Sequence, residues 1–472
     1  RLLSGEMTPE ELEDNPQLIV MARRIYGLAT LEEMGIQLPP IGFDNISDQK
    51  GDIADIELPE YAERLTDNIG NEFVQDPLSF TQSAKLIFST AKTRRIIFIA
   101  IIIRIFLAPW FSHQTDVTAY FLGVSDTIPN ASSPYASLDY PYPPVLMIIL
   151  FPIFKILSIF SDPSHWASTP GEMSILCGEV SICTIIVTSS SFNLFFKLPL
   201  IFCDIFSAIV IFSIITQFKN TEMAQRGMSL YLLNPLTIWV SSVLGQSDSM
   251  LAMFVLFSIY YLIKDDLISS GIMFGLSVMT KGYSLPLVVF LGTFAALFKN
   301  QSVSARISIG KEELARSLKI GTSALIVALS LTIPLVTLGG AGVIFSRQIQ
   351  RPFRPGGVSP FSLAAFDFVP TNKINGGGEI FWLIETLHSI GLEYFIGLFI
   401  AIYLYRMNAD AHLGRGESLI LGCTMHIYFL IFLLGLVNAQ YLVVLVGMLT
   451  ISSFITNNPD TPLRLLYTST VF

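Results

Sequence analysis

The sequence predicts an all-α integral membrane protein built as a helical bundle of about eleven to thirteen spans. Of its 472 residues, 52% are hydrophobic and only 14% are charged, whereas soluble globular domains carry roughly 25% charged residues. The mean hydropathy is +0.60. Apolar runs of about 20 residues, the length of a membrane helix, recur through most of the chain.

Charge divides the chain into two parts. Residues 1–93 hold 17 acidic and 7 basic residues, so this segment carries the acidity of a chain whose net charge is −9. We expect residues 1–93 to form an acidic N-terminal cytosolic segment and residues 94–472 to form a polytopic transmembrane domain. No basic surface of the kind that binds nucleic acid is visible, so no nucleic-acid partner is expected.

The cysteine and histidine residues give no sign of a metal site. All four cysteines lie in apolar runs, where cysteine behaves as a small hydrophobic residue. The five histidines lack the spacing of metal ligands. We therefore expect no metal and no cofactor.

Basic residues predict how the spans are oriented. Lys92, Arg94 and Arg95 immediately precede the first apolar run, and cytoplasmic loops carry an excess of lysine and arginine. Counting spans from there leaves the loop 112–144 and the loop 339–390 on the non-cytoplasmic side. The predicted spans are 96–111, 144–161, 173–190, 195–216, 228–244, 249–263, 268–280, 283–298, 319–338, 391–406, 418–434 and 436–455.

The loop 112–144 holds the first candidate for catalysis. Asp116 follows the first span by about five residues, where a carboxylate at the membrane surface can accept a proton from an attacking hydroxyl. The alternative is a solvated aspartate that caps a short helix. Asp126 and Asp139 lie in the same loop and compete for the role.

The same loop is rich in proline and tyrosine, including Tyr135, Tyr140 and Tyr142. Prolines fix the backbone and tyrosines anchor a chain at the membrane interface. We expect the loop to hold a defined shape that contributes to substrate binding. The alternative is an ordinary interfacial belt of aromatic residues.

Several cations fall on the predicted outer side, where basic residues are normally scarce. Fixed cations at one interface suit a phosphate group, which arginine can bind through two parallel hydrogen bonds. The alternative is that these side chains only reach toward the interface. The candidates for phosphate binding are Lys197, Lys281, Arg347, Arg351 and Arg354.

Other polar residues interrupt the apolar runs. Arg104 and Asp204 lie within predicted spans, where charges are costly and usually face a partner or a functional site. They are either functional or an internal ion pair. Further candidates for substrate binding are Gln246, Asp248, Gln440 and Tyr441, although Asp248 would also serve as a helix cap.

The order of these motifs resembles a known family. The pieces are ThrAspValThrAlaTyr at 115–120, TyrProTyrProPro at 140–144, LysLeuProLeuIlePheCysAsp at 197–204, GlyGlnSerAsp at 245–248, ThrLysGlyTyrSerLeuPro at 280–286 and AsnAlaGlnTyrLeu at 438–442. Together they resemble the C superfamily of glycosyltransferases, and within it the catalytic subunit of GPI mannosyltransferase I and archaeal relatives. These are multispan enzymes that use a polyprenyl-phosphate sugar.

The resemblance implies roles for several residues. Asp116 would be the family's essential acid in the first loop. Gln246 and Asp248 would lie in its second-half turn, and Gln440 and Tyr441 in its terminal glutamine-tyrosine motif. The sequence departs from the mannosyltransferase pattern at Thr118, where the family has a second aspartate.

The sequence-based hypothesis is therefore a membrane hexosyltransferase. It would move mannose from dolichyl-phosphate mannose to a glycolipid or glycoprotein acceptor on the non-cytoplasmic face, with Asp116 as general base. The membrane would be the endoplasmic reticulum in a eukaryote or the plasma membrane in an archaeon. Two alternatives remain open: a transporter or lipid flippase, and a non-catalytic subunit of a glycosyltransferase complex.

Overall fold

The structure is a computed structural model in which part of the chain is described. The described residues are 79–113, 117, 120–121, 123–124, 142–168, 174–176, 182–184, 187–298, 310–335, 356–357, 391–411, 415–433, 436–437 and 439–455. They all belong to the second of two compact units, Phe73–Phe472. Most of the predicted N-terminal segment thus lies outside the described residues.

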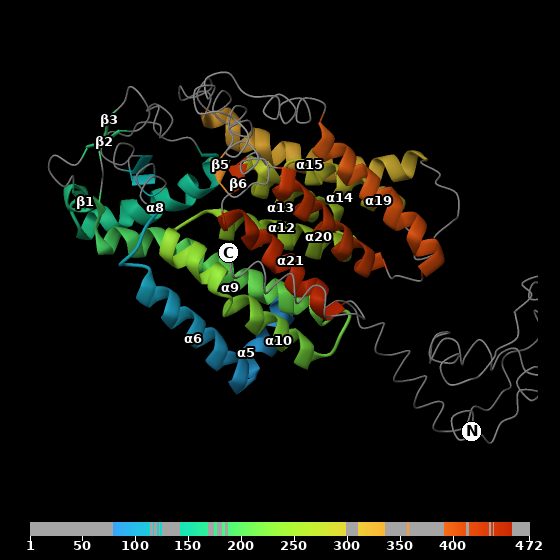
Figure 1. Ribbon diagram of the computed structural model, residues 1–472, viewed down its shortest axis with the longest axis horizontal. Coiled ribbons are helices and arrows are strands. Elements are labelled where there is room, and N and C mark those ends of the chain that lie inside the picture. Colours follow the sequence, from blue (N-terminus) through green and yellow to red (C-terminus); the bar gives the residue numbers. More distant parts are fainter. Residues whose placement is uncertain are drawn as a thin grey trace, which may run out of the picture. The chain divides into compact units, whose positions relative to one another are not determined.

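The described residues confirm an all-α membrane protein (Figure 1). Short strand pairs occur only as minor additions, β1 (Ala167–Ser168) with β4 (Val187–Thr188), β2 (Ser174–Leu176) with β3 (Ile182–Thr184), and β5 (Gly356–Gly357) with β6 (Leu436–Val437). The helices are α5 (Phe80–Ser89), α6 (Ala91–Leu107), α8 (Pro144–Phe160), α9 (Ser190–Ile215), α10 (Thr221–Leu232), α11 (Pro235–Ile238), the π-helix η3 (Trp239–Leu244), α12 (Asp248–Ile263), α13 (Leu267–Val278), α14 (Leu287–Leu297), α15 (Lys311–Leu335), α19 (Leu392–Ala411), α20 (Arg415–Leu433) and α21 (Leu442–Ile455), with 3₁₀ turns η2 (Pro163–His165), η4 (Gly282–Ser284) and η8 (Ala439–Tyr441).

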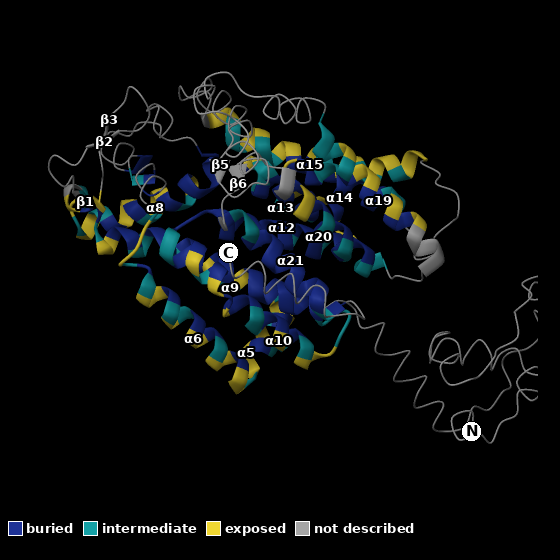
Figure 2. Cartoon of the chain, viewed as in Figure 1, coloured by how far each residue is buried: buried dark blue, intermediate teal, exposed yellow. Residues whose placement is uncertain are grey.

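Helix α9 is the centre of the bundle. It packs against α5, α6, α8, α10, α12 and α21, and Figure 1 shows it in green between α6 and α13. Its start is fixed by Ser189, whose side chain accepts a hydrogen bond from the Phe192 amide. In its most apolar stretch 78% of the residues are buried, against 17% for α15. Figure 2 accordingly shows α9, α12 and α21 mostly buried, and α6 and α15 with exposed faces.

Within the described residues, α9 and α15 are long and apolar enough to cross a membrane. A bent pair, Thr221–Leu232 with Pro235–Leu244, reaches the same length if it counts as one span, with a bend of 48°. Several further apolar helices are shorter than 18 residues. The count of eleven to thirteen spans stays a prediction.

One predicted span is wrong where the structure describes it. The range 173–190 holds β2, β3 and β4 instead of a helix. The run is apolar, but it is rich in β-branched residues such as Ile182 and Thr184, which favour strands. The neighbouring pair 268–280 and 283–298, left open as one helix or a broken one, forms two helices, α13 and α14, separated by η4.

A second apolar core lies outside the main one. It gathers residues of the predicted first outer loop, α8 and α9, around the fully buried Trp166. Tyr120 and Tyr142 stack with ring centres 4.9 Å apart, and the Tyr120 ring also contacts Phe196 of α9 at 5.1 Å. The described part of this loop is therefore packed against the bundle.

Candidate functional site

The sequence-predicted site residues divide into those that the structure describes and those that it does not. Described are Arg104, Tyr142, Lys197, Asp204, Gln246, Asp248, Lys281, Gln440 and Tyr441. Outside the described residues lie Asp116, Tyr135, Tyr140, Arg347, Arg351 and Arg354, together with Asp126 and Asp139.

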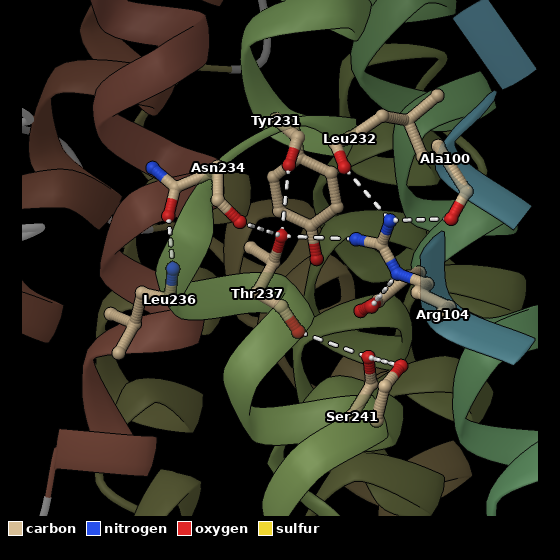
Figure 3. Close-up of polar contacts among 10 residues, drawn as sticks. Ala100, Arg104, Tyr231, Leu232, Asn234, Leu236, Thr237 and Ser241 are labelled. Carbon is tan, nitrogen blue, oxygen red and sulfur yellow. Dashed lines mark hydrogen bonds and ion pairs between the residues drawn. The ribbon is translucent and has the colours of Figure 1, made fainter. Parts of the chain in front are cut away.

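Arg104 and Asp204 form an ion pair whose side chains are both 0% exposed. The Arg104 Nε donates to Asp204 Oδ2 at 3.0 Å. Its Nη1 donates to the carbonyl oxygens of Leu232 at 2.8 Å and Ala100 at 3.3 Å, and its Nη2 to the Thr237 hydroxyl at 3.1 Å (Figure 3). The guanidinium thus ties α6 to α9 and to the bend after α10.

The bend itself is held by side chains that replace missing backbone bonds. Pro235 has no amide hydrogen, so a helix cannot continue through it undisturbed. The Asn234 side chain accepts from the Leu236 amide at 2.9 Å. The Thr237 hydroxyl lies 3.0 Å from both the Tyr231 and Asn234 carbonyl oxygens, as Figure 3 shows. These contacts satisfy polar groups that are costly to bury in a membrane.

Lys197 of α9 is surrounded by backbone oxygens. Its Nζ donates to the carbonyls of Ala108 at 2.9 Å, Ser242 at 3.0 Å and Val243 at 3.2 Å, and to Phe111. An ammonium group has three donors, so these four acceptors use its full capacity. Lys197 joins the end of α6 to the π-helix η3 and is not directed at an open anion site.

Gly245 ends the π-helix η3 beside Lys197. It has φ of +74°, a conformation that residues with a side chain rarely adopt. A Cβ at this position would also lie 2.8 Å from the Phe196 ring and 2.9 Å from the Lys197 side chain. The π-helix therefore ends in a turn that only glycine fits closely.

A second ion pair lies where three breaks between helices meet. The Lys281 Nζ is 2.5 Å from Asp248 Oδ2, and the Asp248 side chain is fully buried. The Tyr283 hydroxyl donates to Asp248 Oδ1 at 3.2 Å. The ring centres of Tyr283 and Tyr441 lie 4.8 Å apart. The Lys281 Nζ lies 5.3 Å from the centre of the Tyr441 ring. We call Asp248, Lys281, Tyr283 and Tyr441 the Asp248–Lys281 centre.

This centre unites residues that the sequence predicted separately. Lys281 was assigned to phosphate binding, and Asp248 and Tyr441 to substrate binding. Gln246 and Gln440, also predicted, are buried in the adjoining turns. Because Asp248 neutralises Lys281, the centre can position a segment or a polar group by hydrogen bonds but carries no excess positive charge.

Two contributors were missed in the sequence. Tyr283 falls inside the quoted motif at 280–286, two residues after Lys281, and this spacing was the available signal. Tyr120 donates to the Ser247 hydroxyl at 3.4 Å and so joins the first outer loop to the turn before α12. Its aromatic neighbours in the loop gave no indication of that partner.

Two described residues of the predicted loop 339–390 pair with residues that are close in sequence to the Gln440 turn. Gly356 and Gly357 pair in parallel with Leu436 and Val437, which precede Gln440 by only a few residues. Segments that the charge rule places on one side are therefore joined in the fold. Among the described residues, no group of three histidine, cysteine or acidic side chains is placed to hold a metal ion.

A separate ion cluster lies at the turn between α12 and α13. Asp265 contacts Arg316 at 3.0 Å (Nη1 to Oδ2) and Arg415 at 2.5 Å (Nη2 to Oδ1), and Arg316 also donates to the Ala295 carbonyl at 2.8 Å. Partial burial by itself raises the pKa of the Asp265 carboxyl, but the hydrogen bonds and charges of the two arginines outweigh it. The pKa of Asp265 is therefore held below its ordinary value.

Comparison with known proteins finds similarity to a protein family and to a solved structure. A family model described as GPI transamidase subunit PIG-U matches residues 127–348, a little under half of the chain. The fold search finds a crystal structure of the Archaeoglobus fulgidus oligosaccharyltransferase in the apo form, at 13% identity and a TM-score of 0.40. That match covers 80% of this chain and 52% of the other, so the chain spans about half the length of the archaeal protein.

The family match corrects the sequence-based hypothesis of a hexosyltransferase, because the matched family is a transamidase subunit and not a mannosyltransferase. The general-base role of Asp116 was part of that hypothesis and is corrected with it. The assignment of phosphate binding to Lys197 and Lys281 rested on their position on the predicted outer side and stays a prediction. The structure supplies the physical reason. A bundle that buries charge needs partners such as those of Arg104 and Lys197 whether or not it catalyses, so such residues do not distinguish an enzyme from a scaffold.

Proposed function

We propose that this chain is a non-catalytic, membrane-embedded subunit of a GPI transamidase complex in the endoplasmic reticulum membrane. The observation that carries the proposal is the family match over residues 127–348. That range contains Lys197, Asp204, Asp248 and Lys281, which take part in the buried ties of the bundle, although Arg104 lies before it.

The buried charges support a scaffold. Arg104 and Asp204 neutralise each other, as do Lys281 and Asp248, and the Lys197 ammonium is satisfied by carbonyl oxygens. Each of these contacts joins segments that are distant in sequence. A general base or a nucleophile needs a reacting partner within reach, whereas these groups are occupied by the protein itself.

Two buried cysteines also support a non-catalytic role. Acyl transfer to an amine commonly uses an accessible nucleophile such as a cysteine thiolate. Cys203 and Cys423 are both free and buried. A thiol in apolar surroundings is inert, so neither of these two is suited to act as the nucleophile of such a transfer.

The outer faces of the bundle offer surfaces for other membrane subunits. Helix α15 exposes Ile326 and Ile333, and α19 exposes Phe395 and Phe399, all by more than half of their side-chain area. Inside a membrane such faces meet either lipid or another helix. A subunit that holds others in place would use them in this way.

The decisive experiment removes the chain from cells that express a reporter protein with a C-terminal GPI-attachment signal. Such a signal tail is removed when the anchor is attached. We expect the uncleaved reporter to accumulate, and re-expression of the chain to restore the anchored form. The chain should also co-purify with the transamidase activity. If the reporter is anchored normally in cells that lack the chain, and the transamidase complex is unchanged in them, the proposal is wrong.

A second measurement separates the alternatives. The purified chain in lipid vesicles should transfer no mannose from dolichyl-phosphate mannose and should move no labelled lipid between leaflets. Lipid translocation by the isolated chain would favour the flippase alternative instead.

A further inference from the structure

Four exposed cations cluster at the corner where α5 meets α6. Lys85 lies on α5, and Lys92, Arg94 and Arg95 lie in the first turns of α6, all with exposed side chains. No acidic residue occurs in the described stretch 79–113. The cluster therefore has no local countercharge within that stretch.

The corner is a built structure. Ser79 and Gln82 form a reciprocal capping box at the start of α5, with contacts of 2.8 and 3.2 Å. Thr93 is fully buried, and its hydroxyl donates to the Thr90 carbonyl at 2.9 Å and to the Ile87 carbonyl. Phe80 packs on Phe257 of α12, with ring centres 5.3 Å apart. The cations thus project from a fixed surface.

The two faces of α6 have opposite surroundings. Its buried face consists of Thr93, Ile97, Ala100 and Arg104. The exposed face is apolar and comprises Phe98 (64%), Ile99 (50%), Ile102 (49%), Ile105 (42%) and Phe106 (68%). These residues recur at helical spacing, so they form a single stripe along α6. The stripe is available to membrane lipid.

Arg94 and Arg95 stand at one end of that stripe. Arg94 precedes Phe98 by four residues and Arg95 precedes Ile99 by four, so each arginine lies one turn from an exposed apolar side chain on the same face. At 1.5 Å per residue, Phe106 lies about 16 Å beyond Arg95 along the axis of α6. An acyl chain lying along this stripe would bring its headgroup to the arginines.

We propose that the α5–α6 corner binds the headgroups of anionic phospholipids in the leaflet on the predicted cytoplasmic side. The lipid phosphate would accept hydrogen bonds from Arg94 and Arg95, with Lys85 and Lys92 adding charge, while the acyl chains pack on the α6 stripe. The continuity of cations with an apolar stripe favours a lipid over a soluble acidic protein. The proposal does not depend on the proposed function.

The test measures lipid binding to the full chain in detergent micelles, with phosphatidylserine and phosphatidylcholine as probes. We expect the chain to prefer phosphatidylserine, and the preference to weaken as salt is raised. The variant K85Q/K92Q/R94Q/R95Q should lose at least about tenfold in phosphatidylserine affinity, since one cation near anionic headgroups contributes about fivefold. Phosphatidylcholine binding should be unchanged.

Two further variants separate the effect of the corner from the effect of net charge. The variant K155Q/K311Q/K319Q/R406Q removes four other exposed cations, so it has the same net charge with the corner intact. The variant R94K/R95K keeps the charge of the corner and should retain most of the preference for phosphatidylserine.

Three results would overturn the proposal. An equal loss of phosphatidylserine binding in both quadruple variants would mean that net charge alone acts. An unchanged affinity in the corner variant would show that the headgroup lies elsewhere. Binding of soluble poly-glutamate but not of phosphatidylserine would identify an acidic protein as the partner. The melting temperature of each variant in phosphatidylcholine reports whether it is folded.

Discussion

The Lys281 ammonium lies 2.5 Å from the fully buried Asp248 carboxylate, and the two residues come from different breaks between helices. Lys281 precedes η4, whereas Asp248 is the first residue of α12. The pair therefore fixes how the α12 and α13–α14 segments meet, with the Tyr283 hydroxyl as a third contact.

Removing one member of this pair should destabilise the bundle. Lys281→Met leaves a buried carboxylate without its cation, and the loss should be about 3 to 5 kcal/mol. The double variant Lys281→Met/Asp248→Asn should recover part of that loss. Thermal unfolding in detergent measures both. Arg226→Gln, which breaks the exposed Arg226–Glu222 pair, is the matched control and should change stability by less than about 1 kcal/mol. Equal effects of the two single variants would contradict this reading.

Arg104 should not be replaceable by lysine. The guanidinium uses three nitrogens at once toward Asp204, Leu232 and Thr237, and a single ammonium cannot reproduce that planar geometry. We expect Arg104→Lys to cost about 2 to 3 kcal/mol, because hydrogen bonds to charged groups contribute on that order. The change in unfolding temperature tests this, and a silent substitution would show that charge alone is required.

A methyl group should separate α13 from α15. A Cβ at Gly271 would overlap the Ser323 side chain and lie 2.5 Å from the Ile320 carbonyl oxygen. Gly271→Ala should therefore destabilise by about 1 to 3 kcal/mol through overpacking.

Gly321 on α15 supplies the control, because a Cβ there meets nothing within 4 Å. Gly321→Ala should be neutral or should stabilise by about 0.5 to 1 kcal/mol, since glycine is the weaker helix former. Thermal unfolding measures both variants. If Gly321→Ala were less stable than Gly271→Ala, the close contact of α13 and α15 would be refuted.

The turn at Asp265 should make the protein sensitive to acid. The two arginines hold the pKa of this carboxyl below its ordinary value. The stabilisation is therefore present above the ordinary aspartate pKa and is lost as pH falls through the lower pKa of the folded state. Asp265→Asn should flatten the fall of the unfolding temperature below about pH 4, and asparagine also tolerates the φ of 62° at this position. An identical acid profile in the variant would contradict the role of the cluster.

The sequence predicted the fold class from apolar runs and hydropathy, but it could not separate all helices from strands. The range 173–190 is apolar enough for a span, and periodicity alone does not distinguish a short buried helix from strands. Likewise, Arg316 and Arg415 lie 51 and 150 residues from Asp265, so no local pattern joins them.

The candidate site was only partly accessible to sequence reasoning. Polar residues between apolar runs, such as Asp248, Lys281 and Tyr441, were visible as candidates because they interrupt the hydrophobic pattern. Their meeting at one centre depends on tertiary packing. The same interruptions suggested catalysis, because a charge that holds helices together and a charge that reacts look alike in sequence.

The contacts of Lys197 make the bundle unequal in its tolerance of mutation. All four acceptors of its ammonium are main-chain oxygens, which remain when the side chain of Ala108, Phe111, Ser242 or Val243 changes. The donor exists in only one side chain. A saturation screen should thus find Lys197 sensitive because no other residue supplies the ammonium. Substitutions at the four acceptor positions keep these hydrogen bonds and are limited only by packing, as at the fully buried Ala108 and Ser242.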